Sequence, residues 1–250
     1  MKIEDCVALV TGGNRGIGEA FVDALLAAGA AHVYVGSRDP KNAKALADSH
    51  GERVTVVELD VTQPGHVETV AKTCTDVTLL VNNAGVFSSE SLMGAADMNA
   101  MRQEMEVNYF GTVAMTRAFA PHIEANGGGA VVNVLSAGGI VAVPEMGGYS
   151  PSKFAARAAS DCLRAELRPK GIHVAALIVG SVRTRMAAHV QGVEQAEPSD
   201  IAHAGILAVQ REIAEHDCDP HAIRIRAALA RDPHGLAQML AAGVGATRNG

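Results

Sequence analysis

The chain has 250 residues, of which 48% are hydrophobic and 19% charged, and its formal net charge is −6. This balance is typical of a globular protein and excludes a disordered chain. Because there is no basic excess, and no apolar stretch reaches the roughly 18 residues that span a bilayer, we expect neither nucleic acid nor a membrane as a partner.

Short apolar runs alternate with helical patterns along most of the chain. The apolar runs predict six strands, at 7–10, 32–36, 54–59, 77–81, 130–135 and 172–179. Apolar residues at three and four spacing predict five helices between them, at 17–28, 43–49, 67–74, 101–123 and 149–168. This order is typical of an α/β fold with a doubly wound parallel sheet. No linker or repeat interrupts it, so we expect one domain over residues 1–250, with ligands at the carboxyl ends of the strands.

The pattern loosens after the sixth strand. Residues 184–195 are polar and mixed, and helices are expected at 199–213 and 220–230. We expect the region 184–232 to form a mobile cover over a substrate pocket. Residues 216–221 read His-Asp-Cys-Asp-Pro-His, but no second ligand pair accompanies them, so we expect a solvated turn and no metal.

A glycine-rich turn joins the first strand to the first helix. It reads Thr-Gly-Gly-Asn-Arg-Gly-Ile-Gly over residues 11–18. Glycines permit positive φ and close approach of the backbone to a pyrophosphate, and the helix that follows offers free N–H groups. A tight βα loop alone would also explain the glycines, but the strand before and the helix after favour a dinucleotide site. Its expected contacts are Gly12, Asn14, Arg15, Gly16, Ile17 and Gly18.

Further motifs follow in a fixed order. Asp60-Val61 follows the third strand, Asn82-Asn83-Ala84-Gly85 the fourth, and Ser136 ends the fifth. Tyr149 stands thirteen residues after Ser136 and four before Lys153. With the Gly-x-x-x-Gly-x-Gly turn, these residues resemble the short-chain dehydrogenase/reductase family over residues 7–184. The resemblance implies a Rossmann-like fold and a nicotinamide cofactor.

The expected chemistry centres on Tyr149. A free phenol has a pKa of about 10, too high for a base near neutrality. Lys153 lies one helical turn later on the same face, and its ammonium would favour the phenolate. Tyr149 would then act as the general acid in reduction and the base in oxidation, while Ser136 would stabilise charge on the substrate oxygen. Singly, a core tyrosine, a solvated lysine and a turn serine are the better explanations of Tyr149, Lys153 and Ser136; their order and spacing together favour catalysis.

The resemblance assigns further roles. Asn108 would position a water that connects Lys153 to solvent, which completes a catalytic set of Asn108, Ser136, Tyr149 and Lys153. Asp60 and Val61 would contact adenine. The other implied cofactor contacts are Asn83, Ala84, Gly85, Tyr149, Lys153, Gly180, Val182 and Thr184. One departure is Val179, which stands where the family usually has proline and leaves the stiffness of that loop in question.

The end of the second strand decides the cofactor. It carries Ser37 and Arg38 and no acid, whereas an acidic residue there would bind the ribose hydroxyl of NAD. Arg15 and Arg38 could fork onto a 2′-phosphate, with Ser37 as a small donor. We therefore expect NADP(H). The alternative is that both arginines are ordinary surface charges.

The substrate is less determined. Val141, Val143, Met146 and Met186 would make an apolar pocket for a hydrophobic ketone or aldehyde, although ordinary packing explains them equally. Carbonyl reduction is the leading hypothesis, with alcohol or hydroxysteroid oxidation close behind. An NADP(H)-sensing protein without catalysis, or a scaffold, are the alternatives from other classes.

Compartment and assembly are the last expectations. Four distant cysteines, Cys6, Cys74, Cys162 and Cys218, form no Cys-x-x-Cys pair, which fits a reducing compartment. Acids at positions 4 and 5 do not suit a secretion signal, so we expect a cytoplasmic protein. By resemblance, the helices at 101–123 and 149–168 would pair across a two-fold axis in a homodimer or homotetramer.

Overall fold

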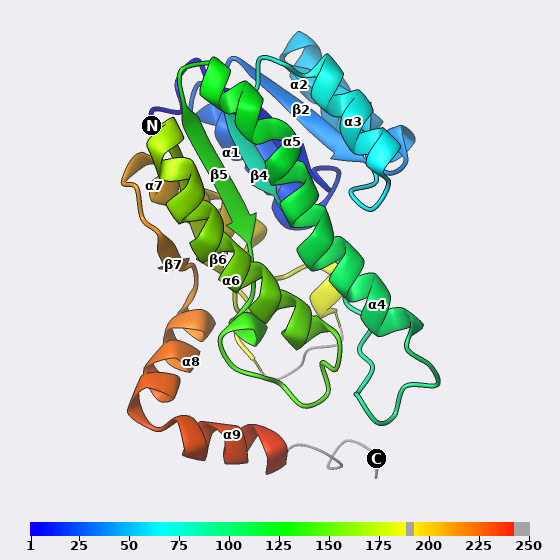
Figure 1. Ribbon diagram of the computed structural model, residues 1–250, viewed down its shortest axis with the longest axis vertical. Coiled ribbons are helices and arrows are strands. Elements are labelled where there is room, and N and C mark those ends of the chain that lie inside the picture. Colours follow the sequence, from blue (N-terminus) through cyan, green and yellow to red (C-terminus); the bar gives the residue numbers. More distant parts are fainter. Residues whose placement is uncertain (189–192, 243–250) are drawn as a thin grey trace.

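A seven-stranded parallel sheet forms the centre of the computed structural model, which describes residues 1–188 and 193–242 (Figure 1). Its strand order is β3-β2-β1-β4-β5-β6-β7. The strands are β1 (Val7–Thr11), β2 (His32–Ser37), β3 (Val54–Glu58), β4 (Leu79–Asn82), β5 (Gly129–Val134), β6 (Ile172–Ile178) and β7 (Glu215–Asp217). The doubly wound, Rossmann-like α/β fold predicted from the sequence is confirmed.

Helices cover both faces of the sheet. One face carries α1 (Gly16–Ala27), α2 (Lys44–His50) and α7 (Pro198–Gln210), and the other carries α3 (Pro64–Thr73), α5 (Thr112–Ala125) and α6 (Tyr149–Leu167). Figure 1 shows α5 and α6 side by side in front of β5 and β6. Successive strand residues serve opposite faces: Val10 joins the core beneath α1, and Leu9 joins the core beneath α5. Burial on both faces explains why the strands read as continuous apolar runs.

The chain reverses its direction of travel across the sheet between β1 and β4. It runs from β1 outward to β3, then crosses back to β4, which pairs with β1 in the register Val10↔Val81. The carboxyl ends of β1 and β4 therefore lie side by side with diverging loops. Such a switch point forms a crevice in this kind of sheet.

The helix predicted at 101–123 is divided in the structure. It consists of α4 (Asn99–Met105), a π-helical segment (Glu106–Gly111) and α5. A single wide turn adds too little to the apolar pattern of a long helix to be recognised from periodicity alone. The wide turn contains Asn108.

The sequence prediction for residues 216–221 was wrong in part. Glu215–Asp217 form the edge strand β7, and the buried Asp219 begins α8 (Pro220–Arg231). A further helix that was not predicted, α9 (Pro233–Ala242), follows. Three polar residues give no strand signal; the strand pairs with β6 in the register Ala176↔Glu215, and Arg157 and Arg226 form ion pairs with Glu215 and Asp217.

Short 3-10 helices connect the larger elements. They are Pro40–Ala43, Gly51–Arg53, Ala137–Gly139, Arg168–Lys170 and Arg185–Ala187. The predicted cover at 184–232 contains α7, β7 and α8, while residues 189–192 within it lie outside the described residues. In the described part of the chain, no helix is both long and apolar enough to cross a membrane. Nor do residues 1–188 and 193–242 bring three or more His, Cys, Asp or Glu together as metal ligands.

Candidate active site

Thr11 fastens the two loops of the switch point together. Its hydroxyl accepts hydrogen bonds from the backbone N–H groups of Asn83 and Ala84, both at 2.9 Å, and donates to the Val81 carbonyl at 3.3 Å. The Asn83 amide donates to the carbonyls of Thr11 and Gly12 at 2.9 and 3.1 Å. The loop after β4 is thus held directly against the glycine-rich turn.

The glycine-rich turn has the shape of a phosphate cradle. Gly12 and Gly16 have φ of 62° and 57°, which side chains rarely adopt. A Cβ at Gly18 would overlap the Gly12 carbonyl and the Asn83 amide. No side chain caps the N-terminus of α1 after Arg15, so its first N–H groups are available to an anion. Asn14 and Ile17 are half-buried in this turn.

Arg15 and Arg38 are both exposed, on the two loops that end β1 and β2. Ser37 is not: it is buried, and its hydroxyl donates to the Asp39 carbonyl at 2.8 Å. In this arrangement the Ser37 oxygen can only accept, so the expected donation to a phosphate requires that bond to break.

The side chain of Asp60 is fixed near Arg38. Its Oδ1 accepts hydrogen bonds from the Thr62 N–H and hydroxyl, at 2.9 and 2.7 Å. Burial opposes ionisation of Asp60, but these bonds and the nearby charge of Arg38 lower the pKa of the carboxyl below its usual value. Its neighbour Val61 is buried and packs against Gly111, where a Cβ would overlap it.

Tyr149 is the first residue of α6 and lies beside Ser136. Its ring meets Phe87 edge-on, with centroids 5.1 Å apart. Burial raises the pKa of Tyr149, a hydrogen bond with Ser136 lowers it, and the charge of Glu104 raises it further. Ser136 also accepts from the Gly138 N–H at 3.1 Å, which fixes its side chain.

Lys153 is buried under the tyrosine. Its Nζ donates to the Val134 carbonyl at 2.9 Å and lies 5.7 Å from the centre of the Tyr149 ring. Burial lowers the pKa of Lys153 to about 8. The spacing of Tyr149 and Lys153 predicted that the lysine drives Tyr149 towards phenolate; in the structure, burial pushes both groups towards their neutral forms.

Asn108 points from the π-helical segment into the loop after β4. Its amide accepts from the Val86 N–H at 2.9 Å and donates to the Val86 carbonyl at 3.0 Å and to Ser152 at 2.9 Å. Gly85 lies between Asn108 and Lys153: a Cβ on Gly85 would be 3.3 Å from Asn108 Oδ1 and 3.8 Å from Lys153 Nζ. The side chain thereby ties the loop to α6; the expected water-positioning role stays a prediction.

The loop after β6 closes over the glycine-rich turn. Thr184 lies against Gly16, and Val182 is buried. The Val179 carbonyl accepts from the Ala137 N–H at 2.8 Å, and the Gly180 N–H donates to Asp219 at 2.6 Å. These two bonds restrain the loop although Val179 replaces the usual proline.

The expected substrate residues differ in exposure. Val141 is buried, Val143 and Met146 are half-buried, and Met186 is 43% exposed. Three further residues near the site, Phe87, Glu104 and Asp219, were not predicted from the sequence. Only Asp219 had a local signal, since Asp followed by Pro is typical of a helix start.

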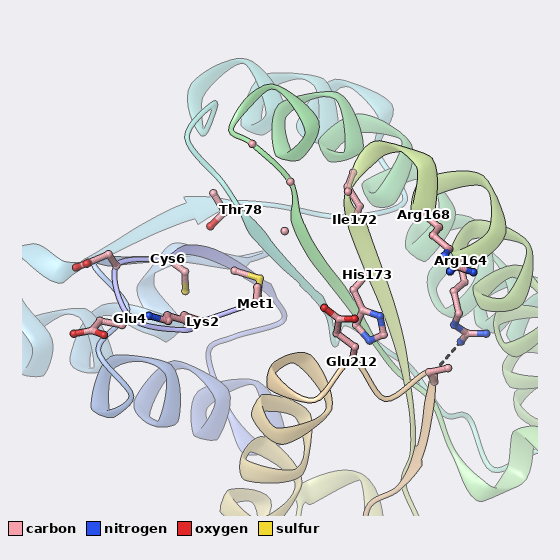
Figure 2. A pocket seen from close by; sticks show the side chains of 16 residues that line it. Met1, Lys2, Glu4, Cys6, Thr78, Arg164, Arg168, Ile172, His173 and Glu212 are labelled. Carbon is pink, nitrogen blue, oxygen red and sulfur yellow. Dashed lines mark hydrogen bonds between the residues drawn. The ribbon is translucent and has the colours of Figure 1, made fainter.

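A separate hollow of about 720 Å³ lies at the amino ends of the strands (Figure 2). Thr78 before β4, Gly128 before β5 and Ile172 at the start of β6 line it, so it lies at the amino ends of the strands. Arg164 and His173 also line it. Arg164 donates hydrogen bonds to the carbonyls of Val174 and Ala214, and a ring nitrogen of His173 is hydrogen-bonded with the Ile213 carbonyl. None of the predicted catalytic or cofactor residues lines this hollow. It is therefore separate from the candidate active site at the carboxyl ends of the strands.

Comparison with known proteins identifies the class. A model of the short chain dehydrogenase family matches residues 6–195. The chain therefore belongs to the short-chain dehydrogenase/reductase family, whose glycine turn and Tyr-x-x-x-Lys pair it carries at the carboxyl edge of the sheet.

Individual relatives agree with this membership. The chain is 32% identical over 198 residues to dehydrogenase/reductase SDR family member 7B of Danio rerio, covering 74% of this chain and 63% of that protein, which is less than two thirds of its length. It is 33% identical over 184 residues to a 3-alpha-(or 20-beta)-hydroxysteroid dehydrogenase of Mycobacterium bovis, covering 72% and 70%. A short chain dehydrogenase from Burkholderia cenocepacia J2315, solved in complex with NADP, superposes with a TM-score of 0.90 at 39% identity, covering 96% and 99%.

Proposed function

We propose that this protein is an NADP(H)-dependent oxidoreductase that reduces a ketone or aldehyde and, in reverse, oxidises the alcohol. The observation that supports the proposal is that Ser136, Tyr149 and Lys153 meet at the carboxyl ends of the strands, where the loop after β4 contacts both Lys153 and the glycine-rich turn. The NADP complex of the Burkholderia relative supports the choice of cofactor.

The glycine-rich turn fits a dinucleotide because no side chain stands between its backbone and a bound pyrophosphate. Gly12, Gly16 and Gly18 leave the N–H groups of α1 exposed to a pyrophosphate, and Arg15 and Arg38 are free to meet a 2′-phosphate. Asp60 would orient the adenine. Val182 and Thr184 would hold the carboxamide end, because their loop closes over Gly16.

When bound, NADP(H) supplies or accepts the hydride. Ser136 would donate a hydrogen bond to the substrate oxygen and stabilise its developing charge. The Tyr149 hydroxyl would deliver a proton to that oxygen during reduction and recover it during oxidation. Lys153, whose pKa of about 8 allows it to gain or lose a proton near neutrality, would exchange the proton with Tyr149 or the ribose.

The substrate would be a hydrophobic carbonyl compound. Val143 and Met146 lie in the segment before α6, and Met186 in the loop after β6, so all three belong to the loops around Tyr149. The Mycobacterium relative is described as acting on hydroxysteroids, which favours a bulky apolar substrate here as well. The four free cysteines suit a reducing compartment, and we place the reaction in the cytoplasm.

The test is the consumption of NADPH with a panel of ketones and aldehydes, together with Tyr149→Phe and an NADH control. We expect turnover with NADPH that falls by about 10²-fold or more in Tyr149→Phe, since the general acid is lost. NADPH binding without turnover on any compound would favour an NADP(H)-sensing protein. Better turnover with NADH would refute the role given to Arg15 and Arg38.

A further inference from the structure

Glu104 is a buried acid that the proposed mechanism does not use. It lies on α4 and only 1% of it is exposed. Its Oε1 accepts hydrogen bonds from the Ser88 N–H and hydroxyl, at 2.8 and 2.9 Å. Its Oε2 has no hydrogen-bond partner among the described residues. A buried carboxylate with an unpaired oxygen is costly to a fold, which indicates that another role retains it.

The carboxylate is packed against the start of the catalytic helix. Oε2 faces Gly148, the residue before Tyr149, so closely that a Cβ there would overlap it. On the other side, Ser88 follows Phe87, whose ring contacts Tyr149. The Gly147 N–H donates to the Glu90 carbonyl at 2.9 Å and closes the same contact. The carboxylate of Glu104, which extends from α4, is therefore enclosed by the 86–90 loop and by the start of α6 at Tyr149.

We propose that Glu104 is a positioning residue whose negative charge disfavours the phenolate of Tyr149, so that alcohol oxidation, which needs the phenolate, begins at higher pH than it would without this acid. This inference rests on the proposed function. The groups around the phenol are Glu104 from α4, Lys153 from α6, the neutral Ser136 and the apolar Phe87. Oxidation needs the phenolate, which a neighbouring carboxylate disfavours.

The direction of the effect agrees with this role. After burial, which is the larger cause, the charge of Glu104 raises the pKa of Tyr149. Removal of that charge lowers the pKa, so the phenolate forms at lower pH. The rising limb of alcohol oxidation against pH then moves to lower pH, and the falling limb of reduction moves with it.

The decisive experiment follows tyrosinate absorbance as a function of pH. The chain has three tyrosines and no tryptophan, so the signal is simple, and subtraction of the Tyr149→Phe curve isolates Tyr149. The subtraction removes the signals of Tyr34 and Tyr109, because both proteins contain these two residues. We expect Glu104→Gln to move the Tyr149 signal to lower pH. Glu106→Gln, an exposed acid two residues along, is the matched control and is expected to leave it in place.

Each outcome decides the matter. An unchanged Tyr149 curve in Glu104→Gln, or an equal shift in Glu106→Gln, would overturn the inference. If Glu104→Gln does not fold, Glu104→Met removes the charge at similar length without a need for hydrogen bonds, and its curve decides. The titration requires no turnover: a shift in a protein that reduces no carbonyl compound would sink the proposed function and leave the electrostatic role of Glu104 standing.

Discussion

Gly18 occupies the tightest point of the glycine-rich turn. The Gly12 carbonyl and the Asn83 amide lie where its Cβ would be, and both are held in place by Thr11 and the loop after β4. A side chain at this position must therefore displace backbone that shapes the cofactor cradle.

We expect Gly18→Ala to lower the free energy of unfolding by roughly 1–3 kcal/mol, as overpacking does, and to weaken NADPH binding. Gly65→Ala is the matched control, because Gly65 lies in helix α3 with nothing within 4 Å of an added Cβ. That change should stabilise the protein by roughly 0.4–1 kcal/mol. Urea unfolding and NADPH fluorescence measure both; equal behaviour of the two variants would contradict the packing argument.

Lys153 gives stability a pH dependence of known sign. Its folded pKa of about 8 is below the unfolded value of 10.5, so the unfolded chain binds more protons between these values. Stability from this group is therefore fully present above pH 10.5 and is lost as pH falls through 8.

Relative to Lys153→Met, the wild-type protein should gain about 2 kcal/mol of unfolding free energy between pH 7 and pH 10. Denaturant unfolding of both proteins at the two pH values measures the difference, and other titrating groups cancel in the comparison. A constant difference would mean that Lys153 titrates as an ordinary lysine.

At the scale of elements, Asp219 joins α8 to the loop after β6. Its carboxylate accepts from the Gly180 N–H at 2.6 Å and from the N–H groups of His221 and Ala222 at 2.9 and 3.0 Å. One side chain thus caps a helix and holds the loop that carries Val182 and Thr184. The hydrogen bond from Gly180 to Asp219 restrains this loop, as a proline at position 179 would through its fixed φ.

Serine at position 219 should separate the two roles. Ser is a good N-cap but is too short to reach Gly180, so Asp219→Ser should keep α8 and weaken NADPH binding several-fold. Asp219→Ala should lose the cap as well, at a further cost of about 1 kcal/mol. Thermal unfolding and NADPH titration compare the three proteins; unchanged NADPH affinity in Asp219→Ser would show that the loop needs no such restraint.

At the scale of the whole molecule, two neighbouring segments present large apolar side chains to solvent. Phe110 in the π-helical segment is 51% exposed, and Phe154 on α6 is 39% exposed. The two segments pack against each other. We propose that this surface pairs two copies of the chain across a two-fold axis, because exposed aromatic side chains are enriched in such interfaces.

Sedimentation should then give a mass of at least twice 25.8 kDa. Phe110→Glu combined with Phe154→Glu should reduce it to the monomer, because charges would be placed in the interface. Ile223→Glu, at an equally exposed position on α8, is the control and should leave the assembly intact. A wild-type protein that sediments as a monomer would refute the proposal.

The sequence by itself determined the α/β class and the edge at which the site lies. Strands buried on both faces must be apolar throughout, and helices that cover them must repeat their apolar residues every three or four positions, so both are visible locally. The glycine-rich turn and the spacing of Ser136, Tyr149 and Lys153 are also local features. They lie at the ends of parallel strands, which the fold necessarily brings to one edge.

Only the tertiary structure decided the features that depend on distant partners. The strand β7 pairs with β6, and Arg157 and Arg226, from two helices, form ion pairs with its Glu215 and Asp217. The π-helical turn exists where Asn108 reaches Val86, and Asp219 matters because Gly180 lies beside it. Glu104 reads as one more polar residue on a helix until folding encloses it beside Tyr149. Apart from the pair Arg226–Asp217, these contacts join residues more than twenty positions apart, and a local pattern carries no record of them.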